Sequence, residues 1–116
     1  MRILIFAAHP DDDILGCGGL IAKRLESGAE IKVVFFVEGT SCRYNDPSDH
    51  RMDLEKKKRN ASGIEALNSL GVKDYIFYNL PCGRLDQVPQ IEINKLMESE
   101  IQNFLPSTIF THSAND

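Results

Sequence analysis

The chain has 116 residues, of which 42% are hydrophobic and 26% are charged, and its net charge is −4. These values are those of an ordinary globular protein of one domain, with a core large enough to need no disulfide bonds. The acidic balance excludes nucleic acid and an anionic membrane surface as expected partners.

Apolar runs and helical periodicities alternate along the chain, and this alternation is typical of α/β proteins. The expected strands cover residues 2–8, 31–37, 75–78 and 108–111. The expected helices cover residues 14–27, 49–70 and 90–104, each stopped by a glycine or a proline. Two stretches rich in turn residues, 38–49 and 80–89, are expected to be loops.

The alternation predicts a Rossmann-like parallel sheet with flanking helices and the strand order 3-2-1-4. In such a sheet the winding reverses between strands one and four, and ligands bind outside the carboxyl ends of those two strands. The loops at that position cover residues 9–13 and 112–116, and both are polar. Because residue 116 falls inside the second loop, we expect residues 1–116 to form one α/β domain that is the N-terminal portion of a longer one.

The first of these loops, His9-Pro10-Asp11-Asp12-Asp13, holds one imidazole and three carboxylates directly after a buried strand. Carboxylates this close repel one another, and a divalent cation is the simplest compensation. His9 and Asp12 are close enough to share Zn²⁺, whose bound water becomes acidic enough to lose its proton near neutral pH. Asp11 would take that proton, and the hydroxide would attack the carbonyl of an amide or ester.

Simpler interpretations compete with this one. An aspartate after a strand often caps the next helix, although one cap accounts for only one of the three aspartates. The run Lys56-Lys57-Lys58-Arg59 is typical of a solvated helix face. The glycines at positions 16, 18 and 19 lack the spacing and the Lys-Ser/Thr of a phosphate-binding loop.

Three cysteines, Cys17, Cys42 and Cys82, lie far apart in the sequence and form no C-x-x-C motif. We expect them to be free thiols in a reducing compartment. Met1 leads directly into the first strand, which is neither a signal peptide nor a membrane span. The sequence therefore predicts a cytoplasmic protein without a membrane span.

The first loop and the helix after it resemble the signature of the LmbE-like (PIG-L) family of zinc-dependent N-deacetylases. That family reads A-H-P-D-D-E, a small apolar stretch and G-G, and the matching string is Ala8-His9-Pro10-Asp11-Asp12-Asp13-Ile14-Leu15-Gly16-Cys17-Gly18-Gly19. Shorter matches are Glu38-Gly39-Thr40, Arg59 twelve residues before Gly71, and Phe110-Thr111-His112 with Asp116.

The resemblance implies that His9 and Asp12 bind Zn²⁺, that Asp11 is the general base and that Arg59 contacts the substrate. His112 is assigned to substrate binding and not to the metal, because the third zinc ligand of the family is a histidine a few residues beyond the equivalent of Asp116. The implied substrate is a small N-acetylated sugar of the N-acetylglucosamine type, and the products are the free amine and acetate.

Two positions depart from the family pattern. Asp13 replaces the usual glutamate, and Ser62 stands where the arginine-bearing helix often has a glutamate.

The residues alone leave one other function open and disfavour another. The chain could be a non-catalytic or incomplete metal-binding module that acts through a partner or as a homo-oligomer, since its exposed last strand can pair with a second copy. A dinucleotide-binding domain needs G-x-G-x-x-G after the first strand, and His9-Pro10-Asp11 breaks that pattern.

Overall fold

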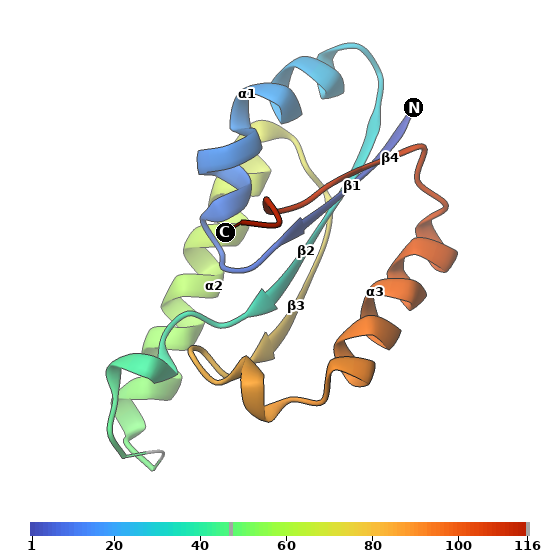
Figure 1. Cartoon of the computed structure of the whole chain (residues 1–116). Coiled ribbons are helices and arrows are strands. Elements are labelled where there is room, and N and C mark those ends of the chain that lie inside the picture. Colours follow the sequence, from blue (N-terminus) through green and yellow to red (C-terminus); the bar gives the residue numbers. More distant parts are fainter. Residues whose placement is uncertain (47, 116) are drawn as a thin grey trace.

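The centre of the protein is a four-stranded parallel sheet in the order β3-β2-β1-β4 (Figure 1). The structure is a computed structural model and describes residues 1–46 and 48–115. Its strands are β1 (Arg2–Ala7), β2 (Glu30–Val37), β3 (Asp74–Leu80) and β4 (Thr108–Phe110). The predicted strand order 3-2-1-4 is confirmed.

Helices cover both faces of this sheet, as Figure 1 shows. Helices α1 (Asp12–Glu26) and α2 (His50–Leu70) lie on one face, and α3 (Gln90–Phe104) lies on the other. The two predicted loops each contain a short 3-10 turn, η1 (Ser41–Arg43) and η2 (Leu85–Gln87). No helix among the described residues is both long enough and apolar enough to cross a membrane.

The core consists of two apolar layers, because alternate residues of the central strands point to opposite faces. The layer beneath α1 and α2 contains buried residues of both central strands and of both helices: Ile3, Ile5, Ala7, Ile31, Val33, Phe35, Ile21 and Leu67. The layer beneath α3 contains Leu4, Phe6, Val34, Phe36 and Phe104. Burial on both faces explains why β1 and β2 are nearly continuous apolar runs.

A polar contact joins α3 to the sheet and accounts for the one lysine in the apolar run of β2. Lys32 Nζ lies 2.8 Å from Glu100 Oε2, and the hydroxyl of Tyr78 donates a hydrogen bond to the same carboxylate. Burial and the contact with Glu100 raise the pKa of Tyr78 to about 12. The charge of Glu100, which is 5% exposed, is thereby compensated.

A second buried carboxylate ties the loop after β2 to the loop after β3. Glu38 is 1% exposed and accepts hydrogen bonds from the backbone N–H groups of Thr40 (2.6 Å), Ser41 (3.0 Å) and Cys82 (3.1 Å). It also accepts one from the Ser41 hydroxyl. We call this arrangement the Glu38 clamp.

The Glu38 clamp sets the ionisation of its own carboxylate. Burial alone would raise the pKa of Glu38, but the hydrogen bonds from Ser41, Cys82 and Thr40 outweigh it and lower the pKa below the ordinary 4.5. A carboxylate whose pKa is lowered by folding stabilises the folded state above its unfolded value, and this contribution is lost as the pH falls through the folded value.

We expect Glu38→Gln to lower the free energy of unfolding by about 2 kcal/mol at neutral pH, because buried hydrogen bonds to a charged acceptor are lost. The difference from the original chain should shrink as the pH falls from 4.5 through the lower pKa of the folded state, below which Glu38 is protonated in both the folded and the unfolded chain. Urea unfolding at several pH values measures this difference. Glu98→Gln, on the exposed side of α3, is the control. A difference that does not depend on pH would contradict the role given to the Glu38 carboxylate.

Candidate functional site

The predicted site lies where the carboxyl ends of β1 and β4 lie side by side. The backbone N–H of Ala8, which follows β1, donates a 3.0 Å hydrogen bond to Nε2 of His112, which follows β4. Figure 1 accordingly shows the segment after β4 beside the start of α1. Two segments about a hundred residues apart in the sequence therefore form one surface.

His9 and Asp12 lie next to each other in the turn that leads into α1. Asp12 Oδ2 accepts a 2.9 Å hydrogen bond from the His9 backbone N–H, and it lies 3.5 Å from Nδ1 of the His9 ring. Both side chains are about one third exposed. The arrangement presents an imidazole nitrogen and a carboxylate oxygen on the same side of the turn, which are donor types that zinc accepts.

The Asp11 side chain does not cap the helix that follows it. Asp11 occupies the N-cap position of α1, and its side chain makes no capping hydrogen bond. The helix begins at Asp12, two residues earlier than its apolar periodicity predicts, so that Asp12 and Asp13 lie in its first turn. The carboxylates of Asp11 and Asp12 therefore remain available for contacts outside the helix.

His112 faces the same carboxylate from the other side. Its Nε2 lies 3.6 Å from Asp12 Oδ2 and accepts the hydrogen bond from Ala8. His112 thereby links the segment after β4 to the turn after β1. A cavity of about 340 Å³ opens here, lined by Ile5, Phe6, Ala7, Asp12, Gly16, Cys17, Phe110, Thr111, His112 and Ser113.

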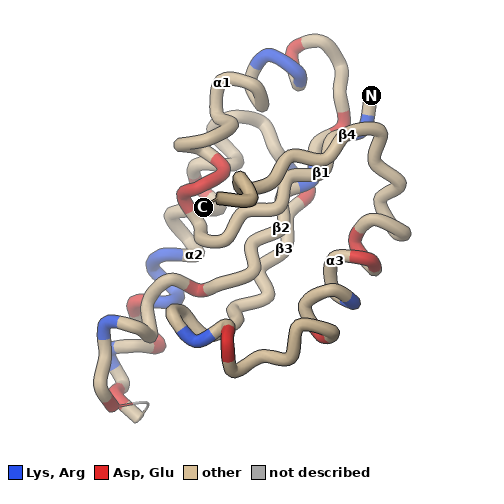
Figure 2. Tube along the Cα trace, in the orientation of Figure 1, with Lys and Arg blue, Asp and Glu red and all other residues tan. Residues whose placement is uncertain are grey.

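Asp11 turns toward α2 and meets Arg59. The Arg59 guanidinium lies 3.4 Å from Asp11 Oδ2, and Figure 2 shows the acidic start of α1 near the basic stretch of α2. Gly39 lets the arginine reach this position. A Cβ atom on Gly39 would lie 2.8 Å from Arg59 Nε, and the backbone φ of +75° also favours glycine.

A second cavity of about 340 Å³ lies along this contact. It is lined by Pro10, Asp11, Thr40, Arg43, Glu55, Lys58, Arg59 and Ser62. The sequence predicted that the basic run of α2 is a solvated helix face, and this holds for only part of the run. Lys57 and Lys58 are exposed, whereas Lys56 and Arg59 are partly buried against cavities.

Asp13 differs from its two neighbours because its side chain points into the protein. It is 2% exposed, and its Oδ2 has no hydrogen-bond partner among the described residues. Burial raises the pKa of Asp13, against backbone hydrogen bonds that lower it, and the charges of Asp11 and Asp12 add to the rise. Burial and the nearby Asp13 also raise the pKa of the Cys17 thiol.

The residues in the described ranges do not form a complete set of metal ligands. No group of three or more histidines, cysteines, aspartates or glutamates in residues 1–46 and 48–115 is arranged to hold an ion. His9 and Asp12 provide two donors of the types that zinc prefers, with solvent-exposed space around them. Asp116, which belongs to the predicted T-H-x-x-x-D loop, lies outside the described residues.

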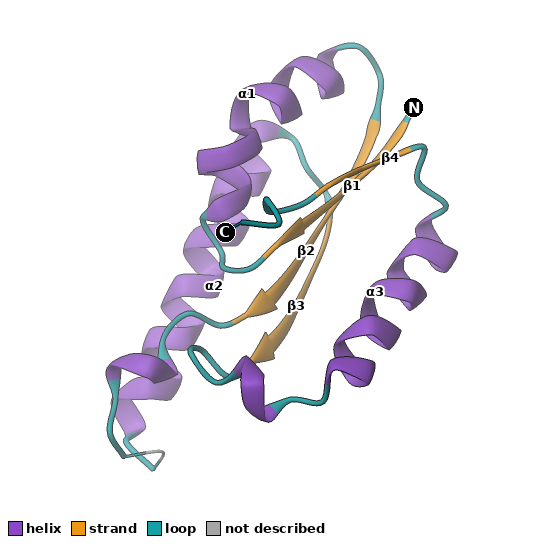
Figure 3. Cartoon of the chain, in the orientation of Figure 1, coloured by secondary structure: helices purple, strands orange, loops and turns teal. Residues whose placement is uncertain are grey.

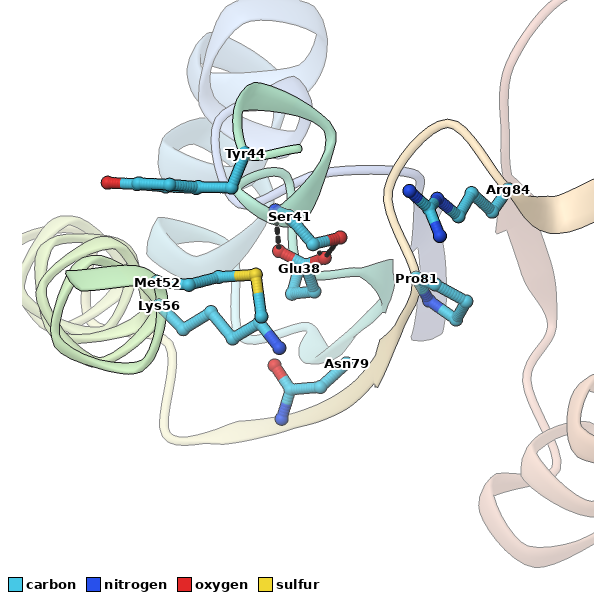
Figure 4. A pocket seen from close by; sticks show the side chains of 8 residues that line it. All are labelled: Glu38, Ser41, Tyr44, Met52, Lys56, Asn79, Pro81 and Arg84. Atoms are coloured by element: carbon cyan, nitrogen blue, oxygen red, sulfur yellow. Dashed lines mark hydrogen bonds between the residues drawn. The ribbon is translucent and has the colours of Figure 1, made fainter. Parts of the chain in front are cut away.

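The loops after β2 and β3 form a third cavity, of about 220 Å³, on the α2 side of the Glu38 clamp. Figure 3 shows both loops at the same edge of the sheet. In Figure 4 the side chains of Met52 and Lys56 extend from α2 on one side, and Arg84 lies on the opposite side. The lining residues are Glu38, Ser41, Tyr44, Met52, Lys56, Asn79, Pro81 and Arg84.

One extra residue in β3 shapes the floor of this third cavity. Phe77 pairs with Phe35, but Leu80 pairs with Val37, so β3 contains a bulge. Asn79 lies in the bulge with φ +55°, and its Oδ1 accepts a 3.0 Å hydrogen bond from Asn60 of α2.

Sequence reasoning missed one close contact at this edge. Cys42 in η1 and Cys82 after β3 place their sulfur atoms 2.7 Å apart, although forty residues separate them. Burial and the contact with Cys42 raise the pKa of Cys82 to about 11. Cys82 Sγ also lies 4.0 Å from Nε2 of His9. Neither cysteine belongs to a short motif, and the strand order alone places only their two loops at the same edge of the sheet.

Curated proteins similar to this chain are deacetylases by name. The 1D-myo-inositol 2-acetamido-2-deoxy-alpha-D-glucopyranoside deacetylase of Kineococcus radiotolerans is 31% identical over 84 residues, which are 71% of this chain and 23% of that protein. The uncharacterized deacetylase YaiS of Escherichia coli is 31% identical over 110 residues, which are 92% of this chain and 52% of that protein. The chain thus spans about half or less of the length of these relatives.

One of the similar solved structures is also a deacetylase by name. The N,N'-diacetylchitobiose deacetylase of Pyrococcus horikoshii superposes with a TM-score of 0.78 at 25% identity, covering 93% of this chain and 39% of that chain. The family described as PIG-L, GlcNAc-PI de-N-acetylase, matches residues 4–116. The chain therefore belongs to the PIG-L (LmbE-like) family.

Proposed function

We propose that the protein is a zinc-dependent hydrolase that removes the N-acetyl group from an N-acetylated sugar. The observation that carries this proposal is that the neighbouring carboxylates of Asp11 and Asp12 face different groups. Asp12 faces His9 and His112, whereas Asp11, one residue earlier, faces Arg59 and a separate cavity. A metal site and a proton-transfer group would thus be adjacent but distinct. Membership of a family with deacetylase relatives supports the same chemistry.

His9 and Asp12 would hold the metal in this proposal. Bound Zn²⁺ would supply an acidic water near neutral pH and a positive charge that polarises the acetyl carbonyl. The exposed space beside the two donors leaves room for a further ligand and for the water. His112, which lies at the opposite side of the Asp12 carboxylate, would bind the substrate at this edge.

Asp11 would accept the proton of the attacking water and pass it to the amine that leaves. A general base must lie near the proton that it removes, and Asp11 is one residue from the proposed ligand Asp12. Its side chain is half exposed, so that solvent and substrate can reach it. Arg59 holds the Asp11 carboxylate from the α2 side and would also bind the sugar.

The shape and polarity of the surroundings agree with a sugar substrate. The cavity beside Asp11 is about 340 Å³ and is lined almost entirely by polar and charged side chains, which suit hydroxyl and acetamido groups. Two relatives act, by their names, on a 2-acetamido-2-deoxyglucopyranoside and on diacetylchitobiose. We therefore propose a substrate of the N-acetylglucosamine type.

We expect zinc affinity to depend on His9 and Asp12. Replacing either residue by alanine should weaken Zn²⁺ binding at least about 100-fold, because a direct ligand contributes more than the outer partners whose loss costs 10- to 100-fold. Calorimetric titration of the chain with ZnCl₂ measures the affinity. His50→Ala, at the start of α2, should leave it unchanged. Equal affinity in the His9 and His50 variants would overturn the proposed ligand set.

We expect Asp11→Asn to lower kcat for release of acetate by about 100- to 10,000-fold, since an amide cannot accept the proton. The zinc affinity should stay within about threefold of the original value, because the proposed ligands are intact. The assay uses the product of the complete reading frame and an N-acetylglucosamine derivative. Asp74→Asn, at the opposite end of the sheet, is the matched control. Unchanged turnover in Asp11→Asn would show that Asp11 is not the base.

We expect Gly39→Ala to displace Arg59, because the new methyl group would overlap its guanidinium. Gly28→Ala provides a matched control. Gly28 also has a positive φ, of +89°, but no atom lies within 4 Å of its Cβ position. Both variants should lose about 1 kcal/mol of stability from backbone strain. Only Gly39→Ala should change the Arg59 Nε resonance in an NMR spectrum, and a Gly28→Ala variant with the same change would contradict this account.

A further inference from the structure

We propose that Cys42 and Cys82 are a redox-active pair and can form a disulfide bond with each other. The oxidant is a small disulfide such as oxidised glutathione. The pair lies beside the proposed metal site, because Cys82 Sγ is 4.0 Å from Nε2 of His9, but neither cysteine is among the proposed ligands or catalytic groups. Both cysteines are free in the reduced chain.

The positions of the two sulfur atoms carry the proposal. They lie 2.7 Å apart, and a disulfide bond requires about 2.05 Å, so a side-chain adjustment of less than 1 Å would bring them to bonding distance. Cysteines whose α-carbons are far apart need backbone movement before they can be bridged, and contact between the sulfurs removes that obstacle. Cys17, in α1, makes no comparable sulfur contact among the described residues.

The backbone on both sides is already fixed in the arrangement that a bridge needs. The Glu38 clamp binds the backbone of Ser41, next to Cys42, and the N–H of Cys82 itself. Gly83 turns the chain away with φ +68° directly after Cys82. The two loops therefore lose little additional freedom when the sulfurs join.

The difference in exposure assigns an order to the two steps. Cys42 is exposed, whereas Cys82 is 6% exposed. The sulfur of Cys42, after losing its proton, attacks one sulfur of oxidised glutathione, breaks its S–S bond and releases one glutathione thiol. The sulfur of Cys82 then loses its proton and attacks the Cys42 sulfur, and the second glutathione leaves as a thiol. Two protein thiols lose two electrons, and one glutathione disulfide gains them.

A bridge at this position would act on the third cavity. Ser41 directly precedes Cys42, Pro81 directly precedes Cys82, and Arg84 follows Cys82 by two residues. These three residues line the cavity of Figure 4. The disulfide would join covalently the loop after β2 and the loop after β3, both of which line that cavity. Oxidation would then fix the distance between these two loops at the third cavity, and a thiol reductant would break the bridge and release them.

The test exposes the full chain, in metal-free buffer at neutral pH, to a series of ratios of oxidised to reduced glutathione. After acid quenching, unreacted thiols are alkylated in denaturant and the protein is digested and weighed by mass spectrometry. We expect a peptide pair joined through Cys42 and Cys82, lighter by two hydrogens than its parts, with only Cys17 alkylated. The melting temperature of the oxidised chain should rise by several degrees, since the bridge restricts the unfolded state.

Two variants make the outcome decisive. Cys17→Ser should form the bridge as the original chain does, and Cys42→Ser, at an exposed position that should tolerate the change, should form none. A product that carries glutathione on Cys42 without the internal bridge would overturn the proposal. Bridges that involve Cys17 as often as the pair, or that form only in denaturant, would overturn it as well.

Discussion

The arrangement of the site depends on one constraint, which is that β1 pairs in parallel with β2 on one side and with β4 on the other. Parallel pairing places the carboxyl ends of neighbouring strands at one edge of the sheet. The turn after β1 thus meets the segment after β4, and the loops after β2 and β3 lie at the same edge. Histidines, carboxylates and an arginine from four separate stretches converge there without any local sequence motif that joins them.

The protein compensates three adjacent carboxylates in three different ways. Asp11 lies beside the Arg59 guanidinium, Asp12 accepts a hydrogen bond from the backbone N–H of His9, and Asp13 is buried with a raised pKa. Each solution requires a different direction for the side chain. The start of a helix supplies these directions, because successive residues there point about 100° apart. The density of negative charge that is conspicuous in the sequence is therefore divided among separate environments.

The sequence predicted most of the fold because its signals are strong. Continuous apolar runs mark β1 and β2, and glycine or proline ends each helix, so the strand order followed from the alternation. The convergence of residues 9–13 with His112 followed from the same order. The start of α1 was predicted two residues late because the periodicity of apolar residues does not register polar residues in a first turn.

The remaining features depend on distances across the fold. The contact of Cys42 with Cys82 and the Glu38 clamp join loops about forty residues apart, and no spacing rule links such positions. The close approach of Arg59 to Gly39 needs the packing of α2 against the end of β2. The bulge at Asn79 leaves no signal in the apolar pattern. It is visible only in the structure, as a shift in the strand register and a positive φ at Asn79.

The bulge in β3 also limits how this edge of the sheet can change during evolution. Successive residues of a strand point to opposite faces, so deleting a single residue there would rotate everything that follows by half a turn. Pro81 and Cys82 would exchange faces, and the backbone donor to Glu38 would be lost together with one wall of the third cavity. Insertions and deletions should therefore be tolerated beyond Arg84, in the chain around η2, far more readily than between Phe77 and Cys82.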